Sequence, residues 1–203
     1  MKKNFTFTTI IFFIIFIILI CFFYKYIKNV NTISIKNKED AEKYILNIKS
    51  YRAEVEVNIS SNKNQNTYEL LQEENLKDKK SRQEVINKEG NRIVIESIMG
   101  KLIIKNTNIN LKKVYENYNY LAENTLYLSS FIEEYKKSNK KEIKENDKYY
   151  VVDIKIKKYK NDYNVRKKLF IDKNNKKIEK LEVYDINQKR TIYILYKKID
   201  INN

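Results

Sequence analysis

The sequence predicts an α+β protein: one long, curved antiparallel sheet with two helices on its concave face, preceded by an N-terminal transmembrane helix. Most of the chain after residue 50 alternates apolar and polar residues, which is typical of strands buried on one face. Two shorter segments instead carry a single apolar stripe at helical spacing, and such a stripe is buried by packing on a sheet. Residues 5–24 form one uninterrupted apolar segment, which predicts the membrane helix.

The apolar segment at residues 5–24 holds seven of the nine phenylalanines and no charged residue. As a helix it is about 30 Å long, enough to cross the hydrocarbon core of a bilayer. It lacks the small-x-small site of a cleaved signal peptide, so we expect residues 1–30 to be an uncleaved signal anchor. The expected product is a single-pass cell-membrane protein with its domain on the extracytoplasmic side, although lysines at both ends leave the charge rule undecided.

Cys21 is the only cysteine and lies near the end of the apolar segment, where a lipoprotein carries its lipid-modified cysteine. Lipoprotein processing requires a small residue before that cysteine, and Ile20 is large. We therefore expect Cys21 to pack as a small hydrophobe in the membrane, with lipidation of Cys21 as the alternative. A lone cysteine excludes an intramolecular disulfide.

Residues 31–37 are predicted to be a polar linker and residues 38–203 one domain. Four of the 41 basic residues and none of the 26 acidic residues lie in residues 1–30, which leaves a net charge of +11 on the rest. This charge favours anionic partners such as phospholipid headgroups, unless the lysines are simply spread over solvated strand faces. Nucleic acid is not expected as a partner, because arginines and aromatic residues do not cluster.

Two helices are predicted in the domain, each from one apolar stripe. The first begins after Asn37, which can cap it, and has apolar residues at positions 41, 44, 45 and 48. The second covers residues 126–137, with Asn124 or Thr125 as the expected N-cap. Leu128, Phe131 and Ile132 belong to its stripe.

Ten or eleven strands are predicted from the alternation, separated by turn signals that include the only glycines, Gly90 and Gly100. The predicted strands are Arg52–Ser61, Tyr68–Asn75, Ser81–Asn87, Arg92–Ile98, Lys101–Asn106, Asn110–Tyr115, Glu142–Glu145, Tyr149–Lys157, Arg166–Asp172, Lys177–Tyr184 and Thr191–Asp200.

The composition excludes most catalytic chemistry. The chain has no histidine, so no Ser-His-Asp or Cys-His pair and no imidazole metal site can form. Two glycines cannot build a phosphate-binding loop or a dinucleotide fingerprint. The adjacent carboxylates Glu73–Glu74 and Glu133–Glu134 point in different directions on a strand or helix, which predicts solvated charges. We therefore expect no enzyme activity, no cofactor and no metal.

The order of these elements resembles the LolA-like superfamily, and within it most closely the clostridial germination lipoprotein GerS and related proteins. The segments that carry the resemblance are Ile48–Tyr51, Arg52–Val57, Ser81–Val85, Met99–Lys101, the helix at 126–137, Leu181–Asp185 and Thr191–Tyr193. Two positions depart from the pattern: Ile20 precedes Cys21, and Met99 stands where the superfamily often has Asp. The resemblance implies a half-barrel, a curved sheet over helices, and a role in spore cortex hydrolysis during germination.

Three functions remain open. The germination resemblance implies a non-enzymatic accessory protein that binds a protein partner such as a cortex hydrolase. The wider superfamily implies a carrier or sensor of a lipid acyl chain or lipoprotein, which needs an apolar cavity. A structural spacer would show neither feature. If an apolar groove exists, we expect it to be lined by Val55, Val57, Ile59, Ile95, Leu128, Phe131 and Ile132.

Overall fold

The computed structural model describes residues 16–20, 35–61, 64–86, 92–118, 125–156 and 164–203. The chain divides into two compact units, residues 1–34 and residues 35–203. In the first unit, residues 16–20 are helical and their side chains are exposed. The rest of the predicted membrane segment, including Cys21, lies outside the described residues. Across the ranges given above, every helix falls short of the length and apolarity needed to span a membrane.

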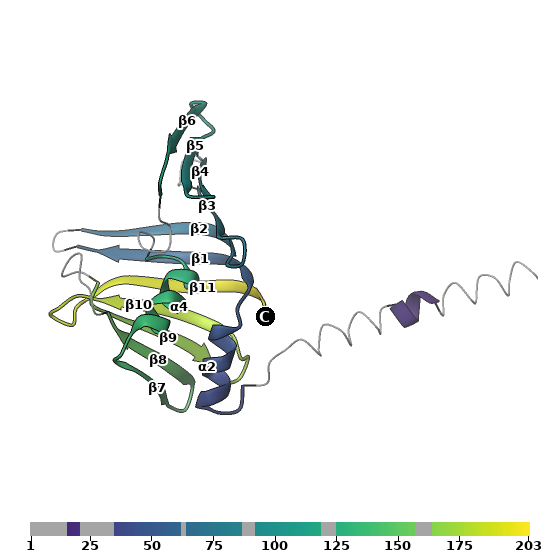
Figure 1. The fold of residues 1–203 in the computed structure, drawn as a ribbon, viewed down its shortest axis with the longest axis vertical. Helices are drawn as coiled ribbons and strands as arrows, with labels where there is room; N and C mark the ends of the chain where they lie inside the picture. The colour runs from purple at the N-terminus through teal and green to yellow at the C-terminus, as the bar shows by residue number, and fades with distance from the viewer. Residues whose placement is uncertain (1–15, 21–34, 62–63, 87–91, 119–124, 157–163) are drawn as a thin grey trace, which may run out of the picture. The chain divides into compact units, whose positions relative to one another are not determined.

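In the described residues of the second unit, the chain forms one antiparallel sheet of eleven strands and two helices (Figure 1). The predicted large antiparallel sheet is therefore confirmed. The elements are α2 (Lys38–Leu46), β1 (Ser50–Ser60), β2 (Gln65–Asn75), β3 (Lys80–Ile86), β4 (Arg92–Ile98), β5 (Lys101–Asn106), β6 (Leu111–Tyr115), α4 (Leu128–Lys137), β7 (Lys141–Glu145), β8 (Tyr149–Lys155), β9 (Arg166–Asp172), β10 (Ile178–Tyr184) and β11 (Arg190–Asn202).

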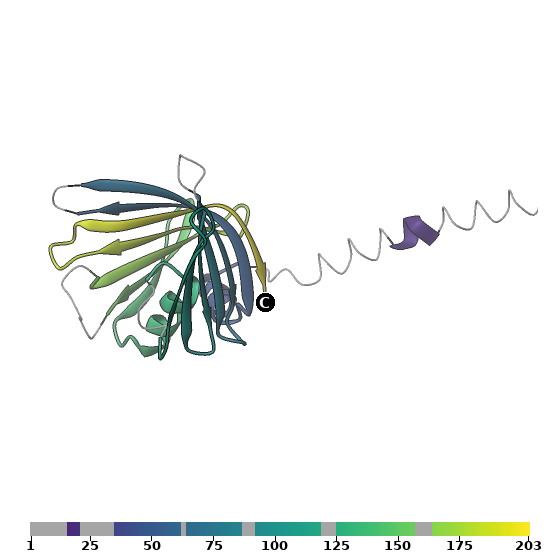
Figure 2. The ribbon, with the colours of Figure 1, turned by 90° about the horizontal axis from the view of Figure 1, so that it is seen from above.

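The sheet consists of two meanders joined side by side. Its strand order is β6-β5-β4-β3-β2-β1-β11-β10-β9-β8-β7, so the first and last strands of the chain meet in the middle. β1 and β11 pair from Ser50 opposite Asn202 to Ile59 opposite Ile192. Figures 1 and 2 show that β3–β6 are turned steeply away from β8–β11, as expected when right-handed twist accumulates over many strands.

Helix α4 lies against the inner face of the curved sheet (Figure 2). Its Phe131 is fully buried, as are Val57 of β1 and Ile194 of β11, whose side chains face the same way because they stand opposite each other in the ladder. Helix α2 contacts β7 and β8. The Tyr135 hydroxyl of α4 donates a hydrogen bond to Glu42 Oε1 of α2 at 2.6 Å, which ties the two helices together.

The two helices are capped in different ways. Asn37 caps α2 as predicted, because its Oδ1 accepts a hydrogen bond from the Asp40 amide at 2.8 Å. The predicted cap of the second helix at Thr125 is wrong. Helix α4 begins at Leu128 after Tyr127, which makes no side-chain cap bond, and Thr125 Oγ1 instead accepts a hydrogen bond from Asn164 Nδ2. Asn124 lies outside the described residues.

Candidate functional site

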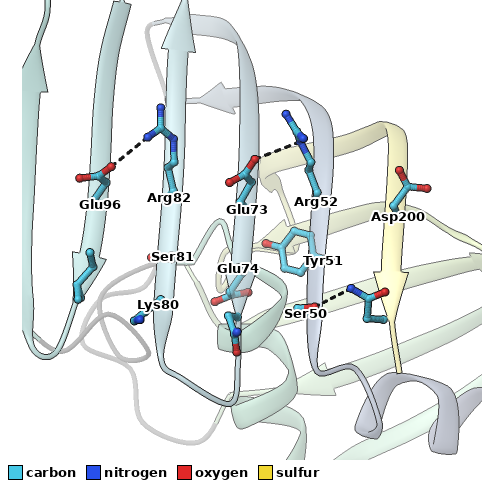
Figure 3. Close-up of a pocket in the computed structure, with 13 residues that line it drawn as sticks. Ser50, Tyr51, Arg52, Glu73, Glu74, Lys80, Ser81, Arg82, Glu96 and Asp200 are labelled. Carbon is cyan, nitrogen blue, oxygen red and sulfur yellow. Dashed lines mark hydrogen bonds and ion pairs between the residues drawn. The ribbon is translucent and has the colours of Figure 1, made fainter.

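A pocket of about 460 Å³ lies where β11, β1, β2, β3 and β4 run side by side (Figure 3). The strand register places five charged residues in one row across these strands, on the face turned away from α4: Asp200, Arg52, Glu73, Arg82 and Glu96. Acidic and basic side chains alternate along the row. Opposite charges facing each other across neighbouring strands stabilise a sheet by a few tenths of a kcal/mol per pair, up to about 1 kcal/mol.

The row is held by ion pairs. Arg52 Nε lies 3.1 Å from Glu73 Oε1, and Arg82 Nη1 lies 3.1 Å from Glu96 Oε1. Arg82 also bonds Glu84 at 3.0 Å, and this hydrogen bond raises the pKa of Arg82 above its usual value. These ion pairs neutralise four of the five charges in the row, and the pocket is also lined by Tyr51 and Glu74.

A buried polar cluster lies on the other side of the same strands, under the start of α4. Glu74 of β2 is 3% exposed, and its Oε2 accepts a hydrogen bond from the Ser129 amide at 3.2 Å. Its other oxygen accepts a hydrogen bond from the Ser129 hydroxyl. Glu74 therefore caps α4 although it lies 55 residues before Ser129 in the sequence. It places a carboxylate at the positive end of the helix dipole.

Burial sets the ionisation of this cluster. Removal from water raises the pKa of Glu74 to about 7, although the bonds from Ser129 oppose the shift. Burial also raises the pKa of Tyr51 well above its usual value, and the charge of Glu74 adds to that shift. The first effect follows from the enclosed position of Glu74, and the second mainly from that of Tyr51. The sequence-based expectation that it is solvated is wrong, whereas Glu73 is exposed as expected.

A second buried charge lies under the same helix. Lys167 of β9 is 0% exposed, and its Nζ lies 2.6 Å from Glu134 Oε2 of α4. Burial lowers the pKa of Lys167, and the charge of Glu134 opposes the shift. Glu134 is thus also not the freely solvated charge that was expected, while Glu133 pairs with Lys136 and Lys137 on the surface.

The seven residues predicted to line an apolar groove fall into three places. Val55, Val57, Leu128, Phe131 and Ile132 are closed into the core between the sheet and α4, each at most 2% exposed. Ile59, by contrast, is 37% exposed on β1. Ile95 lies on β4, separated from Ala53 of β1 by Gln72 and Gln83 in the same cross-strand row. Neither the 460 Å³ pocket nor a second pocket of about 260 Å³ is lined by any of these seven residues.

The structure reveals two functional candidates that sequence reasoning missed, Glu74 and Lys167. Both are charged residues at positions where the alternation of their strand points inward: Glu74 follows Leu70 and Gln72, and Lys167 precedes Leu169 and Ile171. That signal was present in the sequence. Within the described residues no three or more Asp, Glu or Cys side chains are grouped to hold a metal ion.

Comparison with known families gives one match over almost the whole chain. The profile of the family described as "YdcC: Sporulation protein YdcC-like" matches residues 4–203. No curated protein matches the sequence.

Solved structures with a similar fold include a chain from "Structure of the CwlD amidase from Clostridioides difficile in complex with the GerS lipoprotein". It is 25% identical with a TM-score of 0.50, over 79% of this chain and 91% of that one. An uncharacterized conserved protein from Thermus thermophilus is 8% identical, with a TM-score of 0.48 over 80% and 88% of the two chains. A LolA superfamily protein from Nitrosomonas europaea is 10% identical, with a TM-score of 0.39 over 79% and 93%. The predicted resemblance to GerS-related proteins is confirmed.

Proposed function

The chain belongs to the family of YdcC-like sporulation proteins, and from that premise we propose that it acts in spore germination by binding a protein partner, a hydrolase of the spore cortex. The observation that carries the proposal is the 25% identity, over 91% of its length, with a chain from a complex of an amidase and the GerS lipoprotein. The chemistry of the chain agrees with a binding role, because it has no histidine and four of the five charges in its outer row are paired with each other.

The alternative of an acyl-chain or lipoprotein carrier is less well supported. A carrier of this kind needs an apolar cavity that a chain can enter, typically of a few hundred Å³. The predicted lining residues Val57 and Phe131 are instead fully buried against the sheet and helix. Uptake of a lipid would therefore require α4 to move away from the sheet, which would expose the charge pair of Lys167 and Glu134.

Membrane attachment is part of the proposal and rests on the sequence of residues 5–24. We propose an uncleaved signal anchor that holds residues 35–203 on the extracytoplasmic side. Mass spectrometry of the protein extracted from membranes tests this: a mature chain that begins at a lipid-modified Cys21 would replace the anchor by a lipoprotein. Protease added to intact protoplasts should degrade the domain.

The binding function is tested with the full-length chain in detergent and the cortex amidase encoded in the same genome. Light scattering coupled to size exclusion should detect a complex of defined stoichiometry. Deletion of the gene should slow cortex hydrolysis in germinating spores while spore assembly stays intact. Normal germination of the deletion strain, together with no amidase complex, would eliminate the proposed function.

A further inference from the structure

The two ends of the sheet are protected to very different degrees. β6 ends the sheet on one side and β7 ends it on the other. The free edge of a terminal strand exposes unpaired amide and carbonyl groups, and natural proteins usually protect it with charges or a covering element. Protection at one end and its lack at the other therefore indicate where a second chain can be added.

The β7 edge is protected. Its sequence, KEIKE, alternates charges of both signs, and Lys144 pairs with Glu142 while Glu145 pairs with Lys173. Helix α2 contacts this strand, and Lys141 Nζ lies 4.3 Å from the ring of Tyr135 on α4. Charges of both signs and a neighbouring helix are features that protect an edge strand.

Within the residues that the structure describes, the β6 edge carries two lysines, but it has neither the mixed charges of β7 nor a helix packed against it as α2 is against β7. All five of its residues are exposed, and three of them are large and apolar: Leu111, Val114 and Tyr115, between 44% and 48% exposed. Its neighbour β5 is only half-buried. Since the register puts Leu111 and Tyr115 on the inner face and Val114 on the outer face, apolar surface flanks the edge on both sides.

The charge of this edge has one sign. Strands β5 and β6 carry four lysines and no acidic residue. Lys101 and Lys105 are paired with Glu116 and Glu96. Lys112 and Lys113 form no ion pair with any described residue and lie at the centre of β6, one on each face. A strand added to β6 would place its own side chains directly opposite them.

We propose that β6 is the docking edge for the protein partner, which adds an extended strand bearing two adjacent acidic residues between apolar ones. The acidic pair lies opposite Lys112 and Lys113, and the apolar residues lie opposite Leu111, Val114 and Tyr115. Main-chain hydrogen bonds to the edge provide affinity, and the charges fix the register. The inference rests on the proposed function and specifies the surface and the partner chemistry.

The first test uses a labelled peptide, TVIEEVT, and the full-length chain in detergent. Fluorescence anisotropy should show binding that weakens with salt, and the charge-reversed peptide TVIKKVT should bind about tenfold more weakly or worse. The double variant Lys112→Glu with Lys113→Glu should reverse this preference. A matched control, Lys176→Glu with Lys177→Glu in the β9–β10 turn, makes the same change in net charge and should keep the original preference.

Hydrogen–deuterium exchange locates the contact. Binding of TVIEEVT should slow exchange of amides at residues 111–115 and leave residues 141–145 unchanged. Protection elsewhere, or equal binding of both peptides, would overturn the proposal. So would β6 amides pointing away from β5 that are already protected in dilute free protein, since its own chain would then cover the edge. If those amides are protected only in concentrated free protein, a second copy is the occupant and the proposal fails.

The amidase separates this inference from the proposed function. If the amidase binds the wild type and the Lys112→Glu, Lys113→Glu variant equally well, the function stands and the β6 assignment fails. If TVIEEVT binds at β6 but no cortex hydrolase binds the wild type, the edge stands and the proposed function fails. Loss of amidase binding in this variant alone, with binding kept in the Lys176→Glu, Lys177→Glu control, supports both.

Discussion

The half of the sheet that the helices cover and the half beyond β3 consist of similar strands, but the side chains of the two halves are buried to different extents. In β8 and β10, most side chains are buried, and Val152, Leu181 and Val183 have no exposed surface. In β5 and β6 every side chain is half-buried or exposed, although the sequences KLIIKN and LKKVY are as apolar as many core strands. Strand composition alone therefore does not determine burial. The position of the two helices does.

The largest expected difference in the free energy of unfolding is between two substitutions, one in each half of the sheet. Phe131→Asp places an unpaired charge in the fully buried site under α4 and should cost more than about 5 kcal/mol, close to the whole stability of a domain. Val114→Asp on exposed β6 should cost about 1 kcal/mol or less. Urea unfolding followed by circular dichroism measures both. A cooperatively folded Phe131→Asp protein would show that α4 is not essential to the core.

The buried ion pair between Lys167 and Glu134 tests the half of the sheet that α4 covers. Glu134→Ala leaves the charge of Lys167 without its partner, and we expect a loss of about 3–5 kcal/mol in the free energy of unfolding. The double variant Lys167→Met with Glu134→Leu removes both charges and should be within about 1 kcal/mol of wild type. Chemical denaturation measures the free energy of unfolding of both variants. If the double variant loses as much stability as Glu134→Ala, the ion pair itself stabilises the fold.

The raised pKa of Glu74 predicts how the free energy of unfolding changes with pH. Its pKa rises from 4.5 to about 7 on folding, so the folded protein holds the proton more tightly, and stability falls as pH rises from about 4.5 to about 7. The full change is about 3 kcal/mol. No histidine titrates in this window. Unfolding curves at pH 5 and pH 8 should differ in the wild type and coincide for Glu74→Gln. A wild-type curve without this difference would contradict the buried cap.

The smallest effect is expected on the outer charged row. The side chain of Arg52 is 71% exposed, and its ion pair with Glu73 lies in water. Arg52→Ala should therefore change the free energy of unfolding by less than about 1 kcal/mol. A much larger loss by thermal unfolding would mean that the row contributes to the rigidity of the sheet between its two halves.

Much of this fold can be predicted from local patterns. The strands at 92–98, 101–106 and 166–172 have the predicted bounds, because alternation, Asn-rich turns and Gly100 mark them in the sequence. The cap at Asn37 is equally local. The cap of α4 is not, since Glu74 lies on a strand far away in the sequence and only the pairing of the sheet brings it to Ser129. No pattern within residues 124–128 could have revealed it.

The candidate sites show the same division. Alternation places Val55 and Val57 inward, which is correct, but it does not say that α4 closes over them and leaves Ile95 outside that core. The charged row at Arg52 and Arg82 depends on the register of β11, β1, β2, β3 and β4, and each register is set by contacts with other strands. The candidate sites therefore depend on pairing between strands that lie far apart in the sequence. No local sequence pattern reveals that pairing.

The meeting of β1 and β11 at the centre of the sheet has a consequence for how the chain folds. The Asn202 side chain donates a hydrogen bond to Ser50 Oγ across a sequence separation of 152 residues. Each meander can form from neighbouring hairpins, but one side of β1 stays unpaired until β11, which is made last of the described strands, reaches it. Completion of the core is therefore late and slow compared with hairpin formation. During that interval the unprotected strand in the middle of the sheet, and not β6, is the greatest hazard for misassembly between nascent chains.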